Sequence, residues 1–407
     1  MVKLQITLLK SLHHRPFALL WSGQTISRLG DSLYSVALAW WVLEKTGSAT
    51  AMGNVLIFSF APTLIFLLLG GVVVDRFPRL RVMLLSDLLR GLVVTAVALL
   101  AFGGALAIWH IYVASVLFGL VRAFFEPAYV ATVPEITPGE ALTSANSLTN
   151  LSRELTGIAG PALGAAIVGL GGTAAAFGLD ALSFFVSAAC IVGLPPLPPA
   201  RAAEQEANIL SDLRAGLGAV FAQPWLWITI AIFALVNVTA SGPRGVALPF
   251  LVRESLHADV GTLGLLLSFA SAGLMLGSVW LGRKTRLRRR GLVAYGASLV
   301  GGLAILAIGL PIGVAGVAAA LLCHGFTMAL FSLIWTNTLQ EMVPRELMGR
   351  VVSVDMLGSF VLLPIGFGVA GWATDLAGAQ AVFLIGGALT TALIGMGLLH
   401  PAIRHLD

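Results

Sequence analysis

The sequence predicts an all-α polytopic membrane protein, with twelve transmembrane helices in two pseudo-symmetric six-helix bundles. The first observation behind this prediction is composition: 58% of the residues are hydrophobic and only 11% are charged, whereas soluble domains carry about 25% charged residues. The second is that apolar segments of membrane-spanning length follow one another with short loops between them. The third is that basic residues gather in alternate loops, which is typical of helices that cross a membrane repeatedly.

The apolar segments define the expected helices. Several contain Gly or Pro, which membrane helices tolerate because neighbouring helices satisfy the freed backbone groups. The expected helices span residues 17–43, 50–74, 80–102, 108–129, 141–168, 173–194, 225–251, 260–282, 291–309, 314–341, 347–373 and 380–399.

The distribution of charge predicts the topology. With the N-terminus inside, the cytoplasmic loops hold most of the basic residues, including the run at 283–290, whereas the outer loops hold only Lys45 and Arg253. This asymmetry predicts cytoplasmic N- and C-termini. We therefore interpret the net charge of +5 as a topological signal and expect no nucleic-acid partner. Residues 1–16 are expected to form a short basic cytoplasmic arm and not a cleavable signal peptide.

The longest polar interval, residues 195–223, separates six expected helices from six. We expect bundles at 17–194 and 224–400, a cytoplasmic linker at 195–223 with an amphipathic helix in its second part, and a C-terminal tail at 401–407. The halves repeat each other: Gly282-Arg283-Lys284 occupies the position in the second half that Asp75-Arg76 occupies in the first. Repeated bundles of this kind are typical of secondary transporters.

A charged hairpin joins the second and third expected helices. Its spacing is G-x-x-x-D-R-x-x-R-x-R, formed by Gly71, Asp75, Arg76, Arg79 and Arg81. The glycine permits close helix approach, the arginines favour a cytoplasmic loop, and the acid is placed to meet the positive N-terminus of another helix. The pattern closely resembles the loop 2–3 signature of the major facilitator superfamily of secondary transporters.

The resemblance implies a conformational gate and narrows the family. In this family the acid of the hairpin locks against helix eleven, which here places Asp75 near residues 347–351, and Asp355 is expected to contribute to the coupling. Residues 20–31, 86–90, 180–184 and 212–216 resemble the macrolide-efflux and enterobactin-exporter-like branch.

Helix five carries a glycine-rich segment that resembles the antiporter signature ending in Gly-Pro-x-x-Gly-Gly, with Ala165 in place of the last glycine. The segment consists of Gly157, Gly160, Pro161 and Gly164. From the residues alone, we interpret it as a kinked surface of small residues where the two bundles meet.

Charged residues inside the membrane mark candidate proton-coupling sites, because a charge in hydrocarbon costs at least about 2.5–3.5 kcal/mol. Arg28 and Asp31 lie one turn apart on helix one and are expected to pair. Asp31 is either a proton carrier or part of a static ion pair that fixes helix one. Arg122 and Glu126 on helix four form a second candidate pair, with a structural role in the inner gate as the alternative.

For the other charged residues inside the membrane we expect a structural role and not proton transfer. We expect Asp87 and Arg90 to form a neutralising pair near the inner end of helix three, and Asp180 to hydrogen-bond in helix packing. The substrate cavity is expected to be lined from helices one, four, seven and ten, by Trp40, Phe124, Phe125, Asn237, Phe331, Trp335 and Asn337. Such a lining favours a bulky amphipathic or cationic compound, with ordinary packing as the alternative.

The sequence therefore predicts a secondary active transporter that exports hydrophobic or amphipathic small molecules by proton-coupled alternating access. The alternatives are a siderophore, lysophospholipid or other metabolite carrier, or an importer or facilitator of the same fold; a polytopic enzyme or receptor-like scaffold is least favoured. We expect no cofactor, no metal and no catalytic residues, since no nucleotide-binding loop is present and the proton gradient supplies the energy. The expected partners are the lipid bilayer, a small-molecule substrate and protons, for a monomer in a bacterial plasma or inner membrane.

Overall fold

The computed structural model describes residues 9–197, 209–284 and 288–407, and no strand occurs among them. Within this part of the chain, 9 helices are long and apolar enough to cross a membrane. The expected all-α polytopic fold class is therefore confirmed. The count of twelve spans and the cytoplasmic placement of the termini stay predictions.

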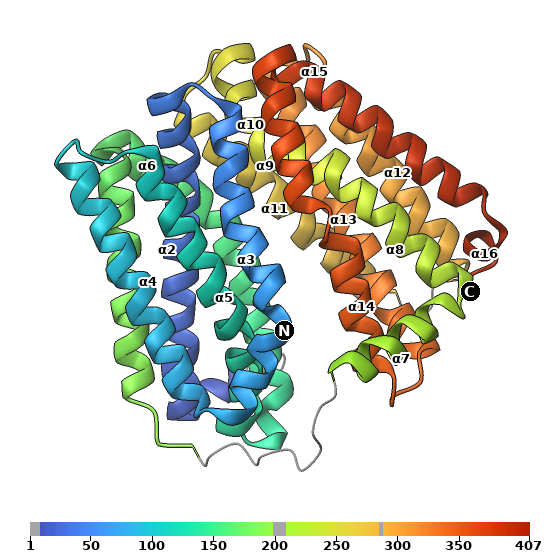
Figure 1. The fold of residues 1–407 in the computed structure, drawn as a ribbon, viewed down its shortest axis with the longest axis horizontal. Helices are drawn as coiled ribbons and strands as arrows, with labels where there is room; N and C mark the ends of the chain where they lie inside the picture. Colours follow the sequence, from blue (N-terminus) through green and yellow to red (C-terminus); the bar gives the residue numbers. More distant parts are fainter. Residues whose placement is uncertain (1–8, 198–208, 285–287) are drawn as a thin grey trace. The chain divides into compact units, whose positions relative to one another are not determined.

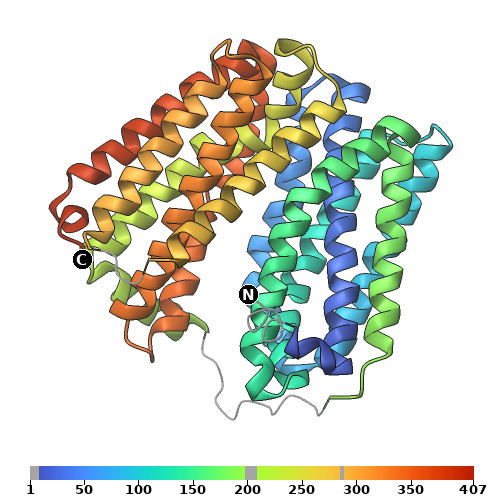
Figure 2. The same ribbon diagram turned by 180° about the vertical axis from the view of Figure 1, so that it is seen from behind.

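The chain divides into two compact units. The first comprises Met1–Thr46 and Phe58–Glu204, and the second comprises Gly47–Ile57 and Gln205–Asp407. The first residues of the second long helix thus group with the second unit, although the helix ends in the first. Figures 1 and 2 show the helices of each unit running alongside one another.

The first unit is built from a short η1 (Lys10–His13) and five long helices. These are α2 (Arg15–Thr46), α3 (Ala49–Arg76), α4 (Arg79–Phe102), α5 (Ile108–Ile136) and α6 (Gly139–Val192). Helix α6 is broken at Gly172, whose φ of 75° lies in the left-handed region that favours glycine. This break separates the two helices that the sequence predicts at 141–168 and 173–194.

Helices α2 and α6 pack closely because glycines remove side chains from their contact. A Cβ at Gly160 would overlap Ser32, and a Cβ at Gly164 would lie 3.1 Å from the Cα of Leu33. Small residues of this kind let membrane helices approach one another. Gly160 and Gly164 therefore pack against α2 inside the first unit, and the expected meeting of the two bundles at this glycine-rich segment stays a prediction.

Polar contacts connect the loops at one end of the first unit. Lys10 Nζ lies 2.8 Å from Glu140 Oε2, and Arg79 forms an ion pair with Glu135. The segment before α2, the start of α4, the end of α5 and the start of α6 therefore share one end. The alternation of basic loops predicts this arrangement.

The second unit contains the remaining helices. These are α7 (Ile209–Phe221), α8 (Pro224–Val236), η2 (Asn237–Ser241), α9 (Gly242–Val246), α10 (Leu248–Phe250), η3 (Leu251–Ser255), α11 (Val260–Gly282), α12 (Arg290–Ile308), α13 (Gly313–Met342), α14 (Met348–Phe360), α15 (Leu363–Leu399) and α16 (Pro401–Arg404). Helix α7 coincides with the helix expected in the linker and packs on α14, where a Cβ at Gly216 would lie 2.9 Å from the carbonyl oxygen of Arg350.

Two irregular segments of the second unit lie side by side. A π-helical turn at Asn237–Ser241 interrupts helix seven, and a two-residue break separates α14 from α15. Pro364 causes this break, since it lacks the N–H that would bond the carbonyl of Phe360. Asn237 Nδ2 donates to the carbonyl oxygen of Ser359 at 2.9 Å. The irregular backbone is thus partly satisfied by a side chain from the neighbouring irregular segment.

Candidate functional site

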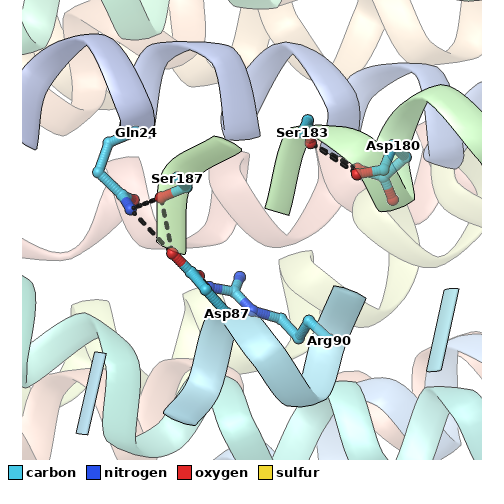
Figure 3. A network of polar contacts seen from close by, with 6 residues as sticks. All are labelled: Gln24, Asp87, Arg90, Asp180, Ser183 and Ser187. Carbon is cyan, nitrogen blue, oxygen red and sulfur yellow. Dashed lines mark hydrogen bonds and ion pairs between the residues drawn. The ribbon is translucent and has the colours of Figure 1, made fainter. Parts of the chain in front are cut away.

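A buried polar network joins α2, α4 and α6 in the first unit (Figure 3). Asp87 on α4 is fully buried and forms an ion pair with Arg90, one turn further along the same helix. The other oxygen of Asp87 accepts a hydrogen bond from Ser187 Oγ at 2.6 Å. Gln24 Nε2 donates to Ser187 Oγ at 2.8 Å and lies 3.5 Å from Asp87. The predicted Asp87–Arg90 pair is therefore confirmed, with two further partners.

Aromatic rings enclose the Arg90 guanidinium. Its central carbon lies 4.4 Å from the ring centre of Phe125 and 4.6 Å from that of Phe184. A cation over two ring faces is attracted by their quadrupoles. Phe125, which was expected in the substrate cavity, is instead buried in the core of the first unit.

Asp180 on α6 packs against the backbone of α2. Its side chain is fully buried, and its Oδ1 lies 3.3 Å from Ser183 Oγ (Figure 3). A Cβ at Gly30 would lie 2.5 Å from the same oxygen. The packing role expected for Asp180 agrees with this geometry, although its Oδ2 has no hydrogen-bond partner among the described residues.

Asp31 follows Gly30 on α2 and is half-buried. Arg90, Arg122 and Arg28, and with the opposite sign the carboxylate of Asp87, act electrostatically on Asp31, but no ion pair involving Asp31 occurs in the described part of the chain. Arg28 lies over the ring of Tyr129, 5.3 Å from its centre. The expected Arg28–Asp31 ion pair is therefore absent here, and Asp31 is a carboxylate in a cationic field without a fixed partner.

Arg122 and Glu126 on α5 are both exposed. The expected pair between them does not form in the described structure.

Two residues expected at the substrate cavity, Trp40 and Phe124, pack in the first unit. Trp40 is buried and donates from Nε1 to Glu44 at 2.8 Å. Phe124 lies 6.5 Å from Phe66, measured between ring centres.

The hairpin between α3 and α4 is described in part. The surroundings of Gly71 and the side chain of Asp75 lie outside the described part of the structure, so the lock of Asp75 against helix eleven stays a prediction. Arg76 and Arg81 are exposed. Arg79 pairs with Glu135 on α5, as noted above, and reaches the carbonyl oxygen of Ala131 at 3.4 Å.

The second unit contains a cavity of about 220 Å³ between its helices. It is lined mainly by aromatic and small polar side chains. The lining includes Thr229, Phe233, Asn237, Ser298, His324, Phe331, Trp335, Asp355 and Ser359. Three residues expected at a substrate cavity, Asn237, Phe331 and Trp335, thus line this one, whereas Trp40, Phe124, Phe125 and Asn337 do not.

Aromatic rings form one wall of the cavity. Phe233 stacks on Phe331 with ring centres 3.8 Å apart, and Phe331 stacks on Trp335 at 6.1 Å. Phe233 was not expected from the sequence, although it lies one helical turn before Asn237, a spacing that places both side chains on one face. Nδ1 of His324 lies 3.2 Å from the carbonyl oxygen of Gly301.

Asp355 on α14 belongs to this cavity. Its Oδ2 accepts a hydrogen bond from Trp335 Nε1 at 2.9 Å, and its Oδ1 accepts one from Ser359 Oγ at 3.3 Å. From the sequence, Asp355 is expected to act at the gate with Asp75. The structure places its carboxylate in the cavity wall, and the coupling to Asp75 stays a prediction.

Comparison with known proteins decides the family. The family model described as Major Facilitator Superfamily matches residues 20–366. The chain belongs to the Major Facilitator Superfamily. It is therefore a membrane transporter, and the resemblance found in the hairpin and the first helix is confirmed.

Curated members of the superfamily resemble the chain along nearly its whole length. The multidrug efflux pump Tap of Mycolicibacterium fortuitum is 30% identical over 414 residues, covering 96% of this chain and 97% of that protein. Macrolide efflux protein A of Streptococcus pyogenes is 24% identical with the same coverage. The enterobactin exporter EntS of Shigella boydii serotype 18 is 26% identical and covers 96% of this chain and 94% of that protein.

Solved structures of superfamily members share the fold. The nucleoside transporter NupG superposes with a TM-score of 0.72 at 14% identity, covering 94% of this chain and 98% of that one. A POT family transporter in complex with 5-aminolevulinic acid gives a TM-score of 0.75 at 12% identity, covering 95% and 96%. At these identities the likeness concerns the fold alone. The bacterial superfamily relatives are cell-membrane proteins, as expected for this chain.

Proposed function

We propose that this transporter exports hydrophobic or amphipathic small molecules in exchange for protons. The curated relatives support the direction, since each is named as an efflux pump or exporter. The observation that carries the proton coupling is the position of Asp31, a half-buried carboxylate surrounded by cations but held by none of them.

Asp31 is better suited to carry a proton than its acidic neighbours. Asp87 is tied to Arg90 and Ser187, so protonation there breaks an ion pair. Asp180 is fully buried, which keeps water away from its carboxylate. Asp31 keeps partial exposure and has no ion pair to break. It therefore takes up or releases a proton at the smallest structural cost.

Proton binding at Asp31 changes the charge inside the first unit. The three arginines that act on Asp31 lose one compensating negative charge when it is protonated. A ligand shifts a conformational equilibrium only through different affinities for the two states. We propose that the two states of the alternating-access cycle differ in the exposure and cationic surroundings of Asp31. Glu126, exposed on α5 near Arg122, is the second candidate carrier.

The proposal is tested in proteoliposomes with an imposed pH gradient. Lumenal pH is followed while macrolides, cationic dyes and siderophores are added one class at a time. We expect one class to drive proton movement in wild type and to lose that effect in Asp31→Asn. Asp259 is an exposed residue at the N-cap of α11. Asp259→Asn is therefore the control for loss of one carboxylate and should keep proton coupling.

Other outcomes point to the alternatives. Substrate movement without proton movement in wild type would identify a facilitator. Substrate that moves in the same direction as the protons would identify an importer. Coupling that survives Asp31→Asn but is lost in Glu126→Gln would transfer the proton site to α5.

A further inference from the structure

The cavity of the second unit contains a carboxylate, that of Asp355, which forms no ion pair in the described part of the chain. Asp355 accepts hydrogen bonds from Trp335 and Ser359, both of which are uncharged donors. No Lys, Arg or His forms an ion pair with it in the described part of the chain. A carboxylate offers about four acceptor positions, so two remain for another partner.

The groups around Asp355 favour a cation as that partner. Trp335 holds the carboxylate and also stacks on Phe331, which in turn stacks on Phe233. A carboxylate beside a row of ring faces is an arrangement that binds organic cations, because the ring quadrupoles and the charge attract the same group. The rest of the lining consists of hydroxyls and apolar side chains, together with the amide of Asn237 and the imidazole of His324.

The basic groups of this region leave Asp355 available. His324 lines the cavity, but its Nδ1 is within hydrogen-bond distance of a backbone carbonyl oxygen, which fixes it as a donor there. Arg244 on α9 acts electrostatically on His324 and is not part of the lining. Neither forms an ion pair with the carboxylate.

We propose that this cavity binds amphipathic organic cations, such as protonated amines and quaternary onium compounds, with Asp355 as the counter-ion and Phe331 and Trp335 as the aromatic wall. This assignment deepens the proposed export function, and its meaning for transport rests on that function. Binding itself requires neither a membrane nor a proton gradient. It is therefore measured separately from export.

The test compares two probes of similar size and shape on the purified full chain in detergent. Methyltriphenylphosphonium carries a permanent positive charge, and triphenylphosphine oxide has the same three rings without a net charge. Radiolabelled methyltriphenylphosphonium is bound at equilibrium and displaced by the neutral compound. We expect wild type to prefer the cation by about tenfold or more, as a charge-assisted contact of modest strength implies.

Three variants separate charge from folding. Asp355→Asn should lose about tenfold in affinity for the cation, while its affinity for the neutral compound changes by about twofold at most. Asp355→Glu should keep the preference for the cation. Asp259→Asn removes a carboxylate of the same unit outside the cavity and should behave as wild type.

Several results would overturn the assignment. These are equal affinity of wild type for both probes, unchanged cation binding in Asp355→Asn, or an equal loss in Asp259→Asn. If Asp355→Asn binds neither probe, Asp355→Glu decides, and its failure to prefer the cation would also overturn the assignment. Asp31→Asn should bind the cation as wild type does, so failure of proton coupling and failure of cation binding are distinguishable.

Discussion

The Asp87–Arg90 pair makes a quantitative prediction about stability. Asp87→Asn keeps the shape of the side chain, with an oxygen to face Arg90 and an N–H₂ group to donate to the Ser187 hydroxyl oxygen, but it removes the negative charge opposite Arg90. The guanidinium then remains between the rings of Phe125 and Phe184 without a counter-ion. Breaking a buried ion pair by removing one partner costs about 3–5 kcal/mol.

We expect the loss of stability in Asp87→Asn to lie at the lower end of this range. The amide oxygen introduced by Asp87→Asn would still accept a hydrogen bond from Arg90, and the ring contacts persist, so we expect about 3 kcal/mol. Adding Arg90→Met to Asp87→Asn removes the orphaned charge and leaves an apolar side chain between the rings, where sulfur–aromatic contacts are favourable. The double variant should therefore be more stable than Asp87→Asn alone, with a coupling free energy of about 2 kcal/mol.

The free energy of unfolding is measured by titrating mixed micelles with sodium dodecyl sulfate and following helical circular dichroism. Arg79→Gln is the matched control, because the Arg79–Glu135 pair lies near the surface and should contribute at most about 1 kcal/mol. A loss below that of the control in Asp87→Asn would refute the reasoning. So would a double variant less stable than the single one.

Three further predictions concern packing and helix ends. Gly30→Ala should destabilise the folded protein by about 1–3 kcal/mol, because the added methyl group overlaps the side chains of Ser183 and Asp180 on α6. Gly169→Ala, which has open space at its Cβ, is the control and should be neutral or stabilising when both variants are compared by thermal unfolding in detergent. The hydrogen bond from the backbone N–H of Thr262 lowers the pKa of Asp259 below its ordinary value of 3.8. Wild type should therefore be more stable than Asp259→Ala by about 1 kcal/mol at neutral pH, and this difference should shrink as the pH falls below 3.8. Asp375 accepts hydrogen bonds from the first backbone N–H groups of α3, and Asp375→Ala should speed hydrogen exchange at Thr50, measured by mass spectrometry against wild type.

Spacing along a helix predicts an ion pair correctly only where no neighbouring helix provides a competing partner for the charged side chain. Asp87 and Arg90 are three residues apart and pair as expected, because Phe125 and Phe184 cover the guanidinium and leave the carboxylate as its polar partner. Arg28 and Asp31 have the same spacing, yet Arg28 lies over the ring of Tyr129 on α5. Spacing places two side chains on one face, but the neighbouring helix selects the rotamer.

Local sequence patterns do not specify contacts between residues that are far apart in the chain. Asp87 meets Ser187, which is 100 residues away, and nothing in either local pattern specifies that partner. The place of Asp355 on helix eleven predicts a role in the gate, whereas its hydrogen-bond partner Trp335 lies on α13. By contrast, the all-α fold class and the family follow from hydropathy and a charged hairpin, both of which are local signals.

The two proposals together determine the charge moved in each cycle. If one proton enters at Asp31 while one monovalent cation leaves from the cavity at Asp355, the exchange moves no net charge, and only the pH gradient drives it. Exchange of the same proton for a neutral substrate moves one positive charge inward, which gains about 2.3 kcal/mol per 100 mV of membrane potential. In proteoliposomes, a potassium diffusion potential set with valinomycin should therefore accelerate proton-coupled export of triphenylphosphine oxide and leave that of methyltriphenylphosphonium unchanged. Equal acceleration of both would contradict the exchange of one proton for one cation, because two protons would then have to enter for each cation that leaves.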